Sequence, residues 1–309
     1  MKYATLGKTG IKVSAVSFGT APLGGMFGTI DADSAASAIH NALDSGINFF
    51  DSSPYYGGGL AEYRLGQALS GSREDVIVGT KVGRYEIDEF DFSPQAIRDG
   101  VRRSLELLQT DYIDILQLHD IEFVPLGPLF EDAYAELVRL KDEGVCRFIG
   151  MTGYPLHALR RAVQECDLDV VLNYAHFTLL NTELRDGFLQ EAEAEGTSVI
   201  NAAAVALGLL TPAGLRTAAP VGPEIVSAAD RARHICENHG VDISYLANQF
   251  SIQRSGCATT LIGTTKSRHL QSAVRAVTEP IDEDLLHAVL AATQDVHAQS
   301  WTSGLKENN

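Results

Sequence analysis

The sequence predicts an α/β fold of the (β/α)8 barrel class, on three observations. Eight short, continuously apolar segments recur along the chain, each typical of a strand in a parallel sheet that is covered on both faces. Amphipathic stretches separate them at intervals of roughly thirty residues, as expected for successive βα units. The 309 residues contain no linker and no break in composition, so we expect a single barrel domain over residues 1–309. A doubly wound open sheet is the weaker alternative.

The expected elements begin with an N-terminal β-hairpin over residues 2–13, which turns at GKTG and is expected to close the bottom of the barrel. A tail, 300–309, lies outside the repeat, and we expect it over the barrel mouth. The eight predicted strands each combine apolar character with a length of six or seven residues: 15–20, 47–52, 76–82, 113–119, 148–153, 170–175, 197–203 and 259–264.

Two helices are especially clear in the sequence. Apolar residues recur on one face of the segment 93–108, where Ser93 can cap the helix and Pro94 suits its first turn. The second helix is expected over 183–195 and ends at Gly196.

Composition and charge argue against several classes of function. The net charge is −16 and no basic stripe is present, so we expect no nucleic-acid partner. The longest apolar run, 198–210, is too short to span a bilayer, and the N-terminus lacks a signal-peptide core. We therefore expect a cytoplasmic protein with no membrane partner. Four widely spaced cysteines without a C-x-x-C pair predict reduced thiols and no metal site: Cys146, Cys166, Cys236 and Cys257.

Four polar residues follow three consecutive strands at their C-terminal ends, where barrel active sites lie. Asp51 ends the second strand, Tyr56 lies five residues further on, Lys81 ends the third strand and His119 ends the fourth. Taken singly, each has a plain structural explanation, such as a turn cap or a packing histidine. A lysine in the apolar stretch VIVGTKVG, however, needs a counter-charge to stay ionised, and Asp51 on the neighbouring strand provides it.

These four side chains have a coherent chemistry. An ammonium beside Tyr56 favours the phenolate and is expected to lower the pKa of Tyr56, which makes it a proton carrier. A neutral His119 can orient the reacting oxygen, while Asp51 holds Lys81 in place. The set moves a proton on and off an alcohol or carbonyl oxygen, and the hydride must go to a cofactor. Tyr55 is left as a pocket or packing aromatic.

The contexts NFFDSSPYYGGGLAEYRLG, VGTKVGR and DILQLHD resemble the catalytic tetrad of the aldo-keto reductases, NAD(P)-dependent (β/α)8 barrels, over essentially the whole chain. The resemblance implies that Asp51, Tyr56, Lys81 and His119 are catalytic. The phrases HDIEF, RFIGMTGYPL, GLLT and WTSGL are similar to the L-galactose dehydrogenase and aldose 1-dehydrogenase branch. That branch implies oxidation of the anomeric C1 hydroxyl of an aldose, such as L-galactose or L-fucose, to the aldonolactone with NAD⁺.

The cofactor is expected to bind outside any Rossmann motif, because no G-x-G-x-x-G follows a strand. In a barrel, a phosphate site is expected at the loops after the seventh and eighth strands, where Thr264 and Thr265 offer hydroxyls and amides. The resemblance implies that NADP-preferring relatives carry cations at the positions of Gly263 and His269. Their absence favours NAD, while Lys266 and Arg268 leave NADP possible.

Further cofactor contacts are implied by the resemblance. Thr152 and Asn173 are expected near the carboxamide, and the ring-stacking tyrosine usual on the seventh strand is missing. The full set of expected cofactor residues is Gly19, Thr20, Asp51, Thr152, Asn173, Asn201, Gly263, Thr264, Thr265 and His269.

A small-molecule aldose is the expected substrate, and the chain is expected to be a monomer or a weak homo-oligomer. Loop and tail residues join Tyr56 and His119 as candidate sugar contacts: Tyr85, Asp120, Glu122 and Trp301. Four alternatives stay open: an NADPH-dependent aldehyde or ketone reductase, a pyridoxal-type dehydrogenase, a barrel aldolase with Lys81 as Schiff base, and a non-catalytic binding subunit.

Overall fold

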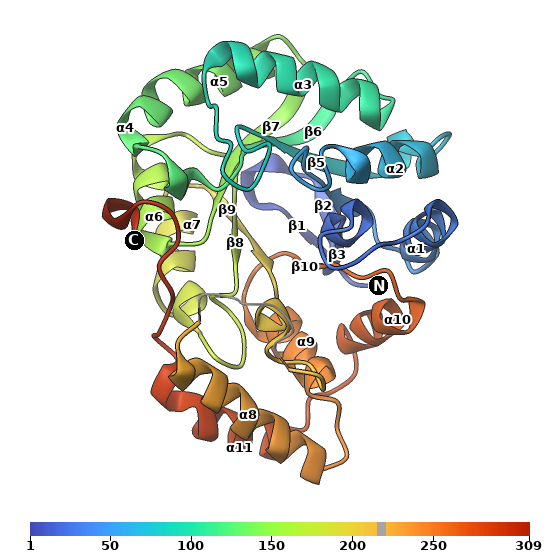
Figure 1. The fold of residues 1–309 in the computed structure, drawn as a ribbon, viewed down its shortest axis with the longest axis vertical. Helices are drawn as coiled ribbons and strands as arrows, with labels where there is room; N and C mark the ends of the chain where they lie inside the picture. Colours follow the sequence, from blue (N-terminus) through green and yellow to red (C-terminus); the bar gives the residue numbers. More distant parts are fainter. Residues whose placement is uncertain (215–220) are drawn as a thin grey trace.

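A closed barrel of eight parallel strands forms the centre of the molecule (Figure 1). The structure is a computed structural model that describes residues 1–214 and 221–309. The strand order around the barrel is β10-β3-β4-β5-β6-β7-β8-β9, and every predicted strand overlaps one of them, so the predicted (β/α)8 fold is confirmed. The strands are β3 (Val16–Gly19), β4 (Phe49–Asp51), β5 (Ile77–Val82), β6 (Ile113–Leu118), β7 (Cys146–Gly153), β8 (Val170–Tyr174), β9 (Ser198–Ala202) and β10 (Thr260–Ile262).

Helices connect these strands around the outside of the barrel (Figure 1). They are α1 (Ala32–Asp44), α2 (Leu60–Ala68), α3 (Pro94–Leu108), α4 (Leu126–Pro128), α5 (Tyr134–Asp142), α6 (Leu156–Glu165), α7 (Leu189–Ala194), α8 (Pro223–Asn238), α9 (Ile243–Arg254), α10 (Ser267–Ala276) and α11 (Glu283–Thr293). The described part of the chain between β9 and β10 includes the α-helices α8 and α9, and α8 packs on α11 outside the ring. A pattern of one helix after each strand does not predict both α8 and α9 in this interval. The long separation between the seventh and eighth predicted strands, 197–203 and 259–264, could have indicated an additional helix.

Both clearly predicted helices form. The Ser93 side chain accepts a hydrogen bond from the Ala96 N–H, and Pro94 is the first residue of α3. The second helix begins with a π-helical turn, Leu184–Phe188, before it continues as α7. Gly196, at φ 71°, allows the left-handed turn that ends it.

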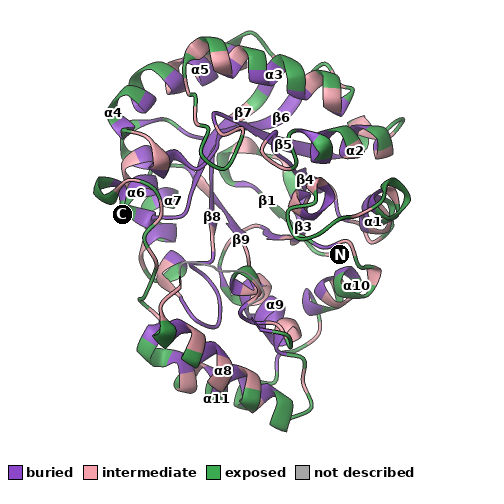
Figure 2. Ribbon diagram, in the orientation of Figure 1, coloured by how far each residue is buried: buried purple, intermediate pink, exposed green. Residues whose placement is uncertain are grey.

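The N-terminal hairpin closes the bottom of the barrel, as expected. Strands β1 (Tyr3–Thr5) and β2 (Lys12–Ser14) pair antiparallel. Leu6 and Val13 are fully buried and pack against Phe49, the first residue of β4, in one apolar cluster. The barrel strands are buried almost throughout (Figure 2), which explains why they read as continuous apolar runs.

The C-terminal tail lies along the loop that follows β6, beside the barrel mouth. Leu305 N–H and the Asn308 side-chain amide donate to the Glu122 carbonyl oxygen at 2.8 and 2.9 Å. Ser303 Oγ donates to Oε1 of Glu122 at 2.9 Å. The tail is therefore tied to the segment directly after His119. Among the described residues, no helix combines the length and apolar character needed to cross a membrane.

Candidate active site

Asp51 and Lys81 form a buried ion pair at the C-terminal end of the barrel. Asp51 is the last residue of β4, and Lys81 lies near the end of the neighbouring β5. The Lys81 ammonium donates to Oδ2 of Asp51 at 2.5 Å and to the Ser52 carbonyl oxygen at 2.7 Å. Gln117 on β6 donates to the other carboxylate oxygen at 3.2 Å. The counter-charge that the sequence predicted for Lys81 is present.

Tyr56 is held beside this pair by a close approach of two loops. Its hydroxyl oxygen lies 3.4 Å from the Lys81 ammonium. The next residue, Gly57, has φ 69°, and a Cβ there would lie 2.3 Å from the Gly24 carbonyl oxygen. Only a glycine fits this crossing, so the glycines after Tyr56 fix the path of the loop that carries it.

His119 packs edge-on against Tyr56, with ring centres 5.8 Å apart and an interplanar angle of 89°. Its Nδ1 lies 2.9 Å from the buried Ser53 hydroxyl, and its Nε2 lies 3.7 Å from Oδ2 of Asp120. The pKa of His119 is lowered to about 3, chiefly by burial; Asp120 opposes this shift, and the positive charges of Lys81 and Arg84 add to it. The imidazole is therefore neutral at physiological pH, as the sequence predicted.

The electrostatics of Tyr56 differ from the sequence prediction. Burial raises the pKa of Tyr56, and Lys81, which lowers it, does not compensate. Burial also raises the pKa of Asp51 against the effect of Lys81. Burial lowers the pKa of Lys81, but Asp51 and Tyr56 raise it by more, so the net shift is upward. The prediction of a lowered Tyr56 pKa was wrong because it counted the nearby charge and not the desolvation.

Two asparagines from neighbouring strands present unused acceptors. Asn173 on β8 is in register with Asn201 on β9. Asn173 donates to the carbonyl oxygens of Gly153 and Tyr154 at 2.9 and 2.8 Å, and Asn201 donates to the Ser251 hydroxyl at 2.8 Å. Both Oδ1 atoms are buried without a hydrogen-bond partner among the described residues. Buried orphan acceptors fit the N–H₂ group of a nicotinamide carboxamide.

Thr152 and Thr20, which are also expected near the cofactor, have hydroxyls that bond to other protein groups. The Thr152 hydroxyl makes two hydrogen bonds to the loop after β6. It accepts from the Asp120 N–H at 2.9 Å and donates to Oδ1 of Asp120 at 3.2 Å. Thr20 donates to the Ser52 hydroxyl at 2.8 Å. Both hydroxyls are therefore already engaged within the protein.

The expected phosphate loop lies between β10 and α10. A Cβ on Gly263 would lie 3.3 Å from the Gly19 carbonyl oxygen, so these two glycines bring β3 and β10 close together. The Thr264 hydroxyl accepts from the Lys266 N–H at 3.1 Å and lies 3.4 Å from Nδ1 of His269. Thr265 follows, half-buried, just before the helix.

The residues expected to contact the sugar lie in three different parts of the structure. The Tyr85 hydroxyl donates to the Ala96 carbonyl oxygen in the first turn of α3, away from the four clustered residues. Trp301 stacks on Tyr154, with ring centres 4.1 Å apart, at the side of the mouth. Asp120 and Glu122 are buried in the loop after β6. Tyr85 is therefore left out of the site, and Glu122 anchors the tail.

Sequence reasoning missed Arg84, the neighbour of Tyr85. Nη1 of Arg84 donates to Oδ2 of Asp120 at 2.5 Å, and the guanidinium carbon lies 4.1 Å from the centre of the Tyr55 ring. It also missed Ser53, the partner of His119. Nothing in the spacing distinguishes Arg84 from Tyr85, since the loop after β5 decides which of them turns towards β6.

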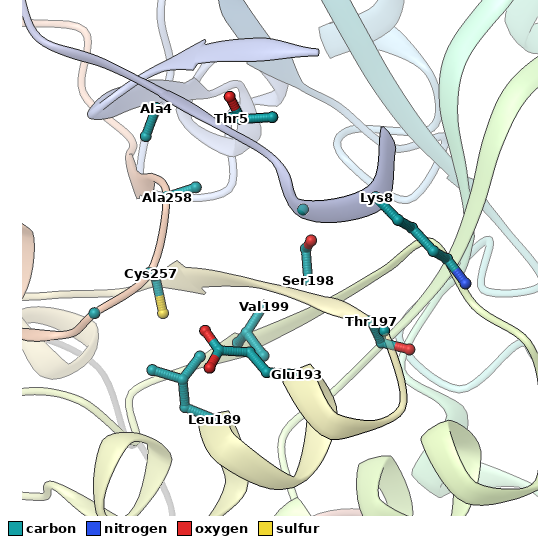
Figure 3. Close-up of a pocket in the computed structure, with 13 residues that line it drawn as sticks. Ala4, Thr5, Lys8, Leu189, Glu193, Thr197, Ser198, Val199, Cys257 and Ala258 are labelled. Carbon is teal, nitrogen blue, oxygen red and sulfur yellow. The ribbon is translucent and has the colours of Figure 1, made fainter. Parts of the chain in front are cut away.

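A cavity of about 400 Å³ lies at the opposite end of the barrel, beside the hairpin (Figure 3). Thr5, Ser198 and Cys257 are among its lining residues, and Lys8 at its edge is paired with Asp167. It contains none of the four clustered residues, so it is separate from the candidate site.

The arrangement at the mouth is suited to proton transfer at an oxygen. A bound nicotinamide would supply the hydride acceptor or donor. Tyr56 and the neutral His119 can then contact one substrate oxygen, and the Lys81–Asp51 pair stabilises negative charge that develops on Tyr56. The described residues contain no group of histidine, cysteine, aspartate or glutamate side chains able to hold a metal ion.

Comparisons with known proteins agree with this geometry. The model of the aldo/keto reductase family matches residues 15–292. The chain is 41% identical to L-galactose dehydrogenase of Arabidopsis thaliana over 98% of both chains. It is 30% identical to D-threo-aldose 1-dehydrogenase of a Pseudomonas species over 87% of this chain and 91% of the other. The holo form of an aldo-keto reductase from Bacillus halodurans superposes with a TM-score of 0.79 at 25% identity, over 98% of both chains. This chain belongs to the aldo/keto reductase family, whose members use nicotinamide cofactors, and it is an oxidoreductase.

Proposed function

We propose that the protein oxidises the anomeric C1 hydroxyl of an aldose, such as L-galactose or L-fucose, to the aldonolactone with NAD⁺. The observation that carries the proposal is the buried cluster at the barrel mouth, in which Tyr56 has its hydroxyl beside the Lys81–Asp51 ion pair and its ring against a neutral His119. The similarity to L-galactose dehydrogenase and to D-threo-aldose 1-dehydrogenase supports a sugar as the substrate.

In this proposal each catalytic residue has one role. Tyr56 accepts the proton of the C1 hydroxyl as the hydride leaves C1. The Lys81 ammonium stabilises the phenolate, and Asp51 keeps Lys81 charged and oriented. His119 donates a hydrogen bond from Nε2 to the same oxygen, which its neutral state permits.

NAD is the proposed cofactor. Asn173 and Asn201 offer their free Oδ1 atoms to the carboxamide, and the segment 263–265 with the start of α10 faces the phosphates. Gly263 and His269 provide no fixed positive charge for a 2′-phosphate. The further proposed contacts are Gly19, Thr20, Asp51 and Thr152.

The proposed sugar site lies on the side of the mouth formed by the loop after β6 and the tail. Asp120 offers carboxylate oxygens to sugar hydroxyls, and Trp301 offers an apolar face. We further propose a cytoplasmic protein that acts as a monomer or weak homo-oligomer.

A panel of aldoses and pyridoxal, assayed with NAD⁺ and with NADP⁺, tests the proposal. We expect NADH to form with L-galactose or L-fucose, and NADP⁺ to be the poorer acceptor. The absence of NADH with every aldose would refute the assignment. Faster NADPH consumption with small aldehydes than sugar oxidation would identify an aldehyde reductase instead, and borohydride trapping of a carbonyl substrate on Lys81 would identify an aldolase.

A further inference from the structure

Arg84 and Asp120 form a nearly buried ion pair beside the catalytic cluster, and the proposed proton transfer has no use for Arg84. The exposed fractions of the two side chains are 12% and 7%. Oδ2 of Asp120, which accepts from Arg84, also lies 3.7 Å from Nε2 of His119. Any substrate oxygen bonded to that nitrogen therefore has the ion pair as its neighbour.

Aromatic rings hold Arg84 in one position. Its guanidinium carbon lies 4.1 Å from the centre of the Tyr55 ring. The same guanidinium carbon lies 5.2 Å from the ring centre of Phe90 and 5.1 Å from that of Phe123, and these two rings stack on each other. A guanidinium fixed by three rings loses little further entropy when it binds a ligand.

Asp120 is held in an unusual backbone conformation. Its φ is 52°, in the left-handed region that is uncommon for residues other than glycine, although aspartate adopts it more readily than most. The Thr152 hydroxyl bonds both its N–H and its carboxylate, which maintains this conformation. Left-handed residues held by several contacts are frequent at ligand sites, because the fold places a side chain there that a relaxed backbone would turn away.

Both members of the pair keep unused hydrogen-bonding capacity. Nε of Arg84 is buried without a partner among the described residues, and Nη2 makes only a long contact of 3.4 Å to the Ile87 carbonyl oxygen. A carboxylate has roughly four acceptor positions. The Asp120 carboxylate uses one for Arg84 and one for Thr152 within the described residues. Within the described residues, the ion pair therefore keeps an N–H donor and acceptor positions that no protein group uses.

We infer that Arg84 and Asp120 bind a hydroxyl group on the carbon next to the one that is oxidised, and thereby select polyhydroxylated substrates over plain aldehydes. The inference rests on the proposed function and specifies how its sugar is recognised. A hydroxyl can donate to the carboxylate and accept from the guanidinium at once, whereas a plain aldehyde has no hydroxyl to use the hydrogen-bonding capacity that the ion pair leaves over. Because Asp120 already neutralises Arg84, the pair gives no general attraction for anionic substrates.

Glyceraldehyde and propanal test this inference, because they share the aldehyde and differ in two hydroxyls. Their reduction with NADH gives a ratio of kcat/KM values for each variant. We expect Asp120→Asn and Arg84→Gln to lower the ratio of kcat/KM for glyceraldehyde to kcat/KM for propanal by about tenfold or more, mainly through the KM for glyceraldehyde. An equal loss with both aldehydes, or an unchanged ratio, would overturn the inference.

A second ion pair at the other end of the barrel provides the matched control. Arg73 contacts Asp114 at 2.9 Å and lies 4.1 Å from the centre of the Tyr112 ring, so the chemistry is the same. Arg73→Gln and Asp114→Asn should lower the melting temperature and leave the substrate ratio unchanged. A shift of the ratio in these variants as well would mean that it reports general loosening, and it would overturn the inference.

The two proposals fail in different ways. Failure to oxidise any aldose refutes the proposed function. The ratio of kcat/KM values for glyceraldehyde and propanal still tests whether Arg84 and Asp120 bind a hydroxyl group. If the enzyme reduces neither aldehyde, the same comparison is made between an oxidised aldose and its 2-deoxy analogue. Aldose oxidation that is intact but equally fast for the deoxy analogue overturns the inference alone.

Discussion

At the scale of single residues, the cluster at the mouth depends on which polar groups share one buried space. The Tyr56 hydroxyl and the Lys81 ammonium lie 3.4 Å apart, and Tyr55 packs on the other side against Arg84 and His119. Two adjacent tyrosines thus have different environments, one with an ammonium and one with a guanidinium over its ring. Only Tyr56 has its hydroxyl beside Lys81, so only Tyr56 has the partner that proton transfer needs.

The paired substitutions Tyr56→Phe and Tyr55→Phe follow from this difference. We expect Tyr56→Phe to reduce kcat by about a hundredfold or more, because the proton carrier is removed, and to leave NAD binding unchanged. Tyr55→Phe should keep most of the activity, since its ring remains under Arg84. Steady-state kinetics and NAD titrations measure both. The reverse result would place the catalytic hydroxyl one residue earlier.

We expect cofactor preference to depend on single residues as well. His269→Arg should raise kcat/KM for NADP⁺ by about tenfold, because a guanidinium near Thr264 can bond a 2′-phosphate, and it should leave NAD⁺ nearly unaffected. Gln271→Arg adds the same charge at an exposed position two residues further along α10 and serves as the control. Equal gains in both variants would show that the effect is general attraction and not a specific contact.

At the scale of elements, two loops that cross at glycines place Tyr56 in the cluster at the mouth. The loop after β3 meets the loop after β4 at Gly24 and Gly57, where a Cβ on either glycine would collide with the backbone of the other loop. The neighbouring Gly58 has a similar φ, 62°, but among the described residues no atom lies within 4 Å of the position that its Cβ would take. A comparison of Gly57 with Gly58 therefore separates a backbone penalty from a loss of space.

Alanine substitutions at Gly57 and Gly58 test the placement of Tyr56. Both variants should lose about 1–2 kcal/mol of stability, because an L-residue disfavours the left-handed region, and Gly57→Ala should lose more because its Cβ meets the Gly24 backbone. Only Gly57→Ala should also lower kcat, by about tenfold or more, since the displaced loop carries the Tyr56 hydroxyl away from Lys81. Thermal melts and kinetics distinguish the two effects. Equal activities in the two variants would show that the crossing does not position Tyr56.

At the scale of the whole molecule, buried titratable groups act on stability in opposite directions. Burial lowers the pKa of His119 to about 3 and that of His176 to about 4, so their contribution to stability grows as the pH rises towards the unfolded value of about 6.5. Burial raises the pKa of Glu62 to about 7 and that of Glu122 to about 8, with Asp120 adding to the shift of Glu122. These glutamates reduce stability as the pH rises.

Glu62→Gln isolates one of these contributions. Glu62 lies in the first turn of α2, where the Thr80 hydroxyl on β5 donates to one carboxyl oxygen at 2.5 Å and the other oxygen has no partner among the described residues. The folded chain keeps a proton that the unfolded chain loses above about pH 4.5. The free energy of unfolding should therefore fall between about pH 5 and pH 8 in both proteins. The decrease should be larger in the parent than in the variant, by at most about 3 kcal/mol. Urea unfolding measures this, with the exposed Glu131→Gln as control; parallel pH profiles would contradict it.

Local sequence patterns were enough to predict the barrel, its hairpin and the chain positions of the four clustered residues. Strand patterns and strand ends are local features, and parallel strands in a barrel bring their C-terminal ends to one rim whatever the helices do. Asp51, Lys81 and His119 could therefore be expected together from the sequence alone. The counter-charge on Lys81 followed for the same reason, since adjacent strands place the two side chains next to each other.

Tertiary packing decides which loop residues join that cluster and in which direction the pKa values of its side chains shift. Arg84 and not Tyr85 turns towards Asp120, because the path of the loop after β5 depends on contacts with α3 and β6. Burial raises the pKa of Tyr56, because desolvation sums over every neighbour, including segments far apart in the chain. Side-chain direction and desolvation are properties of the packed molecule, and no local pattern in the sequence records them.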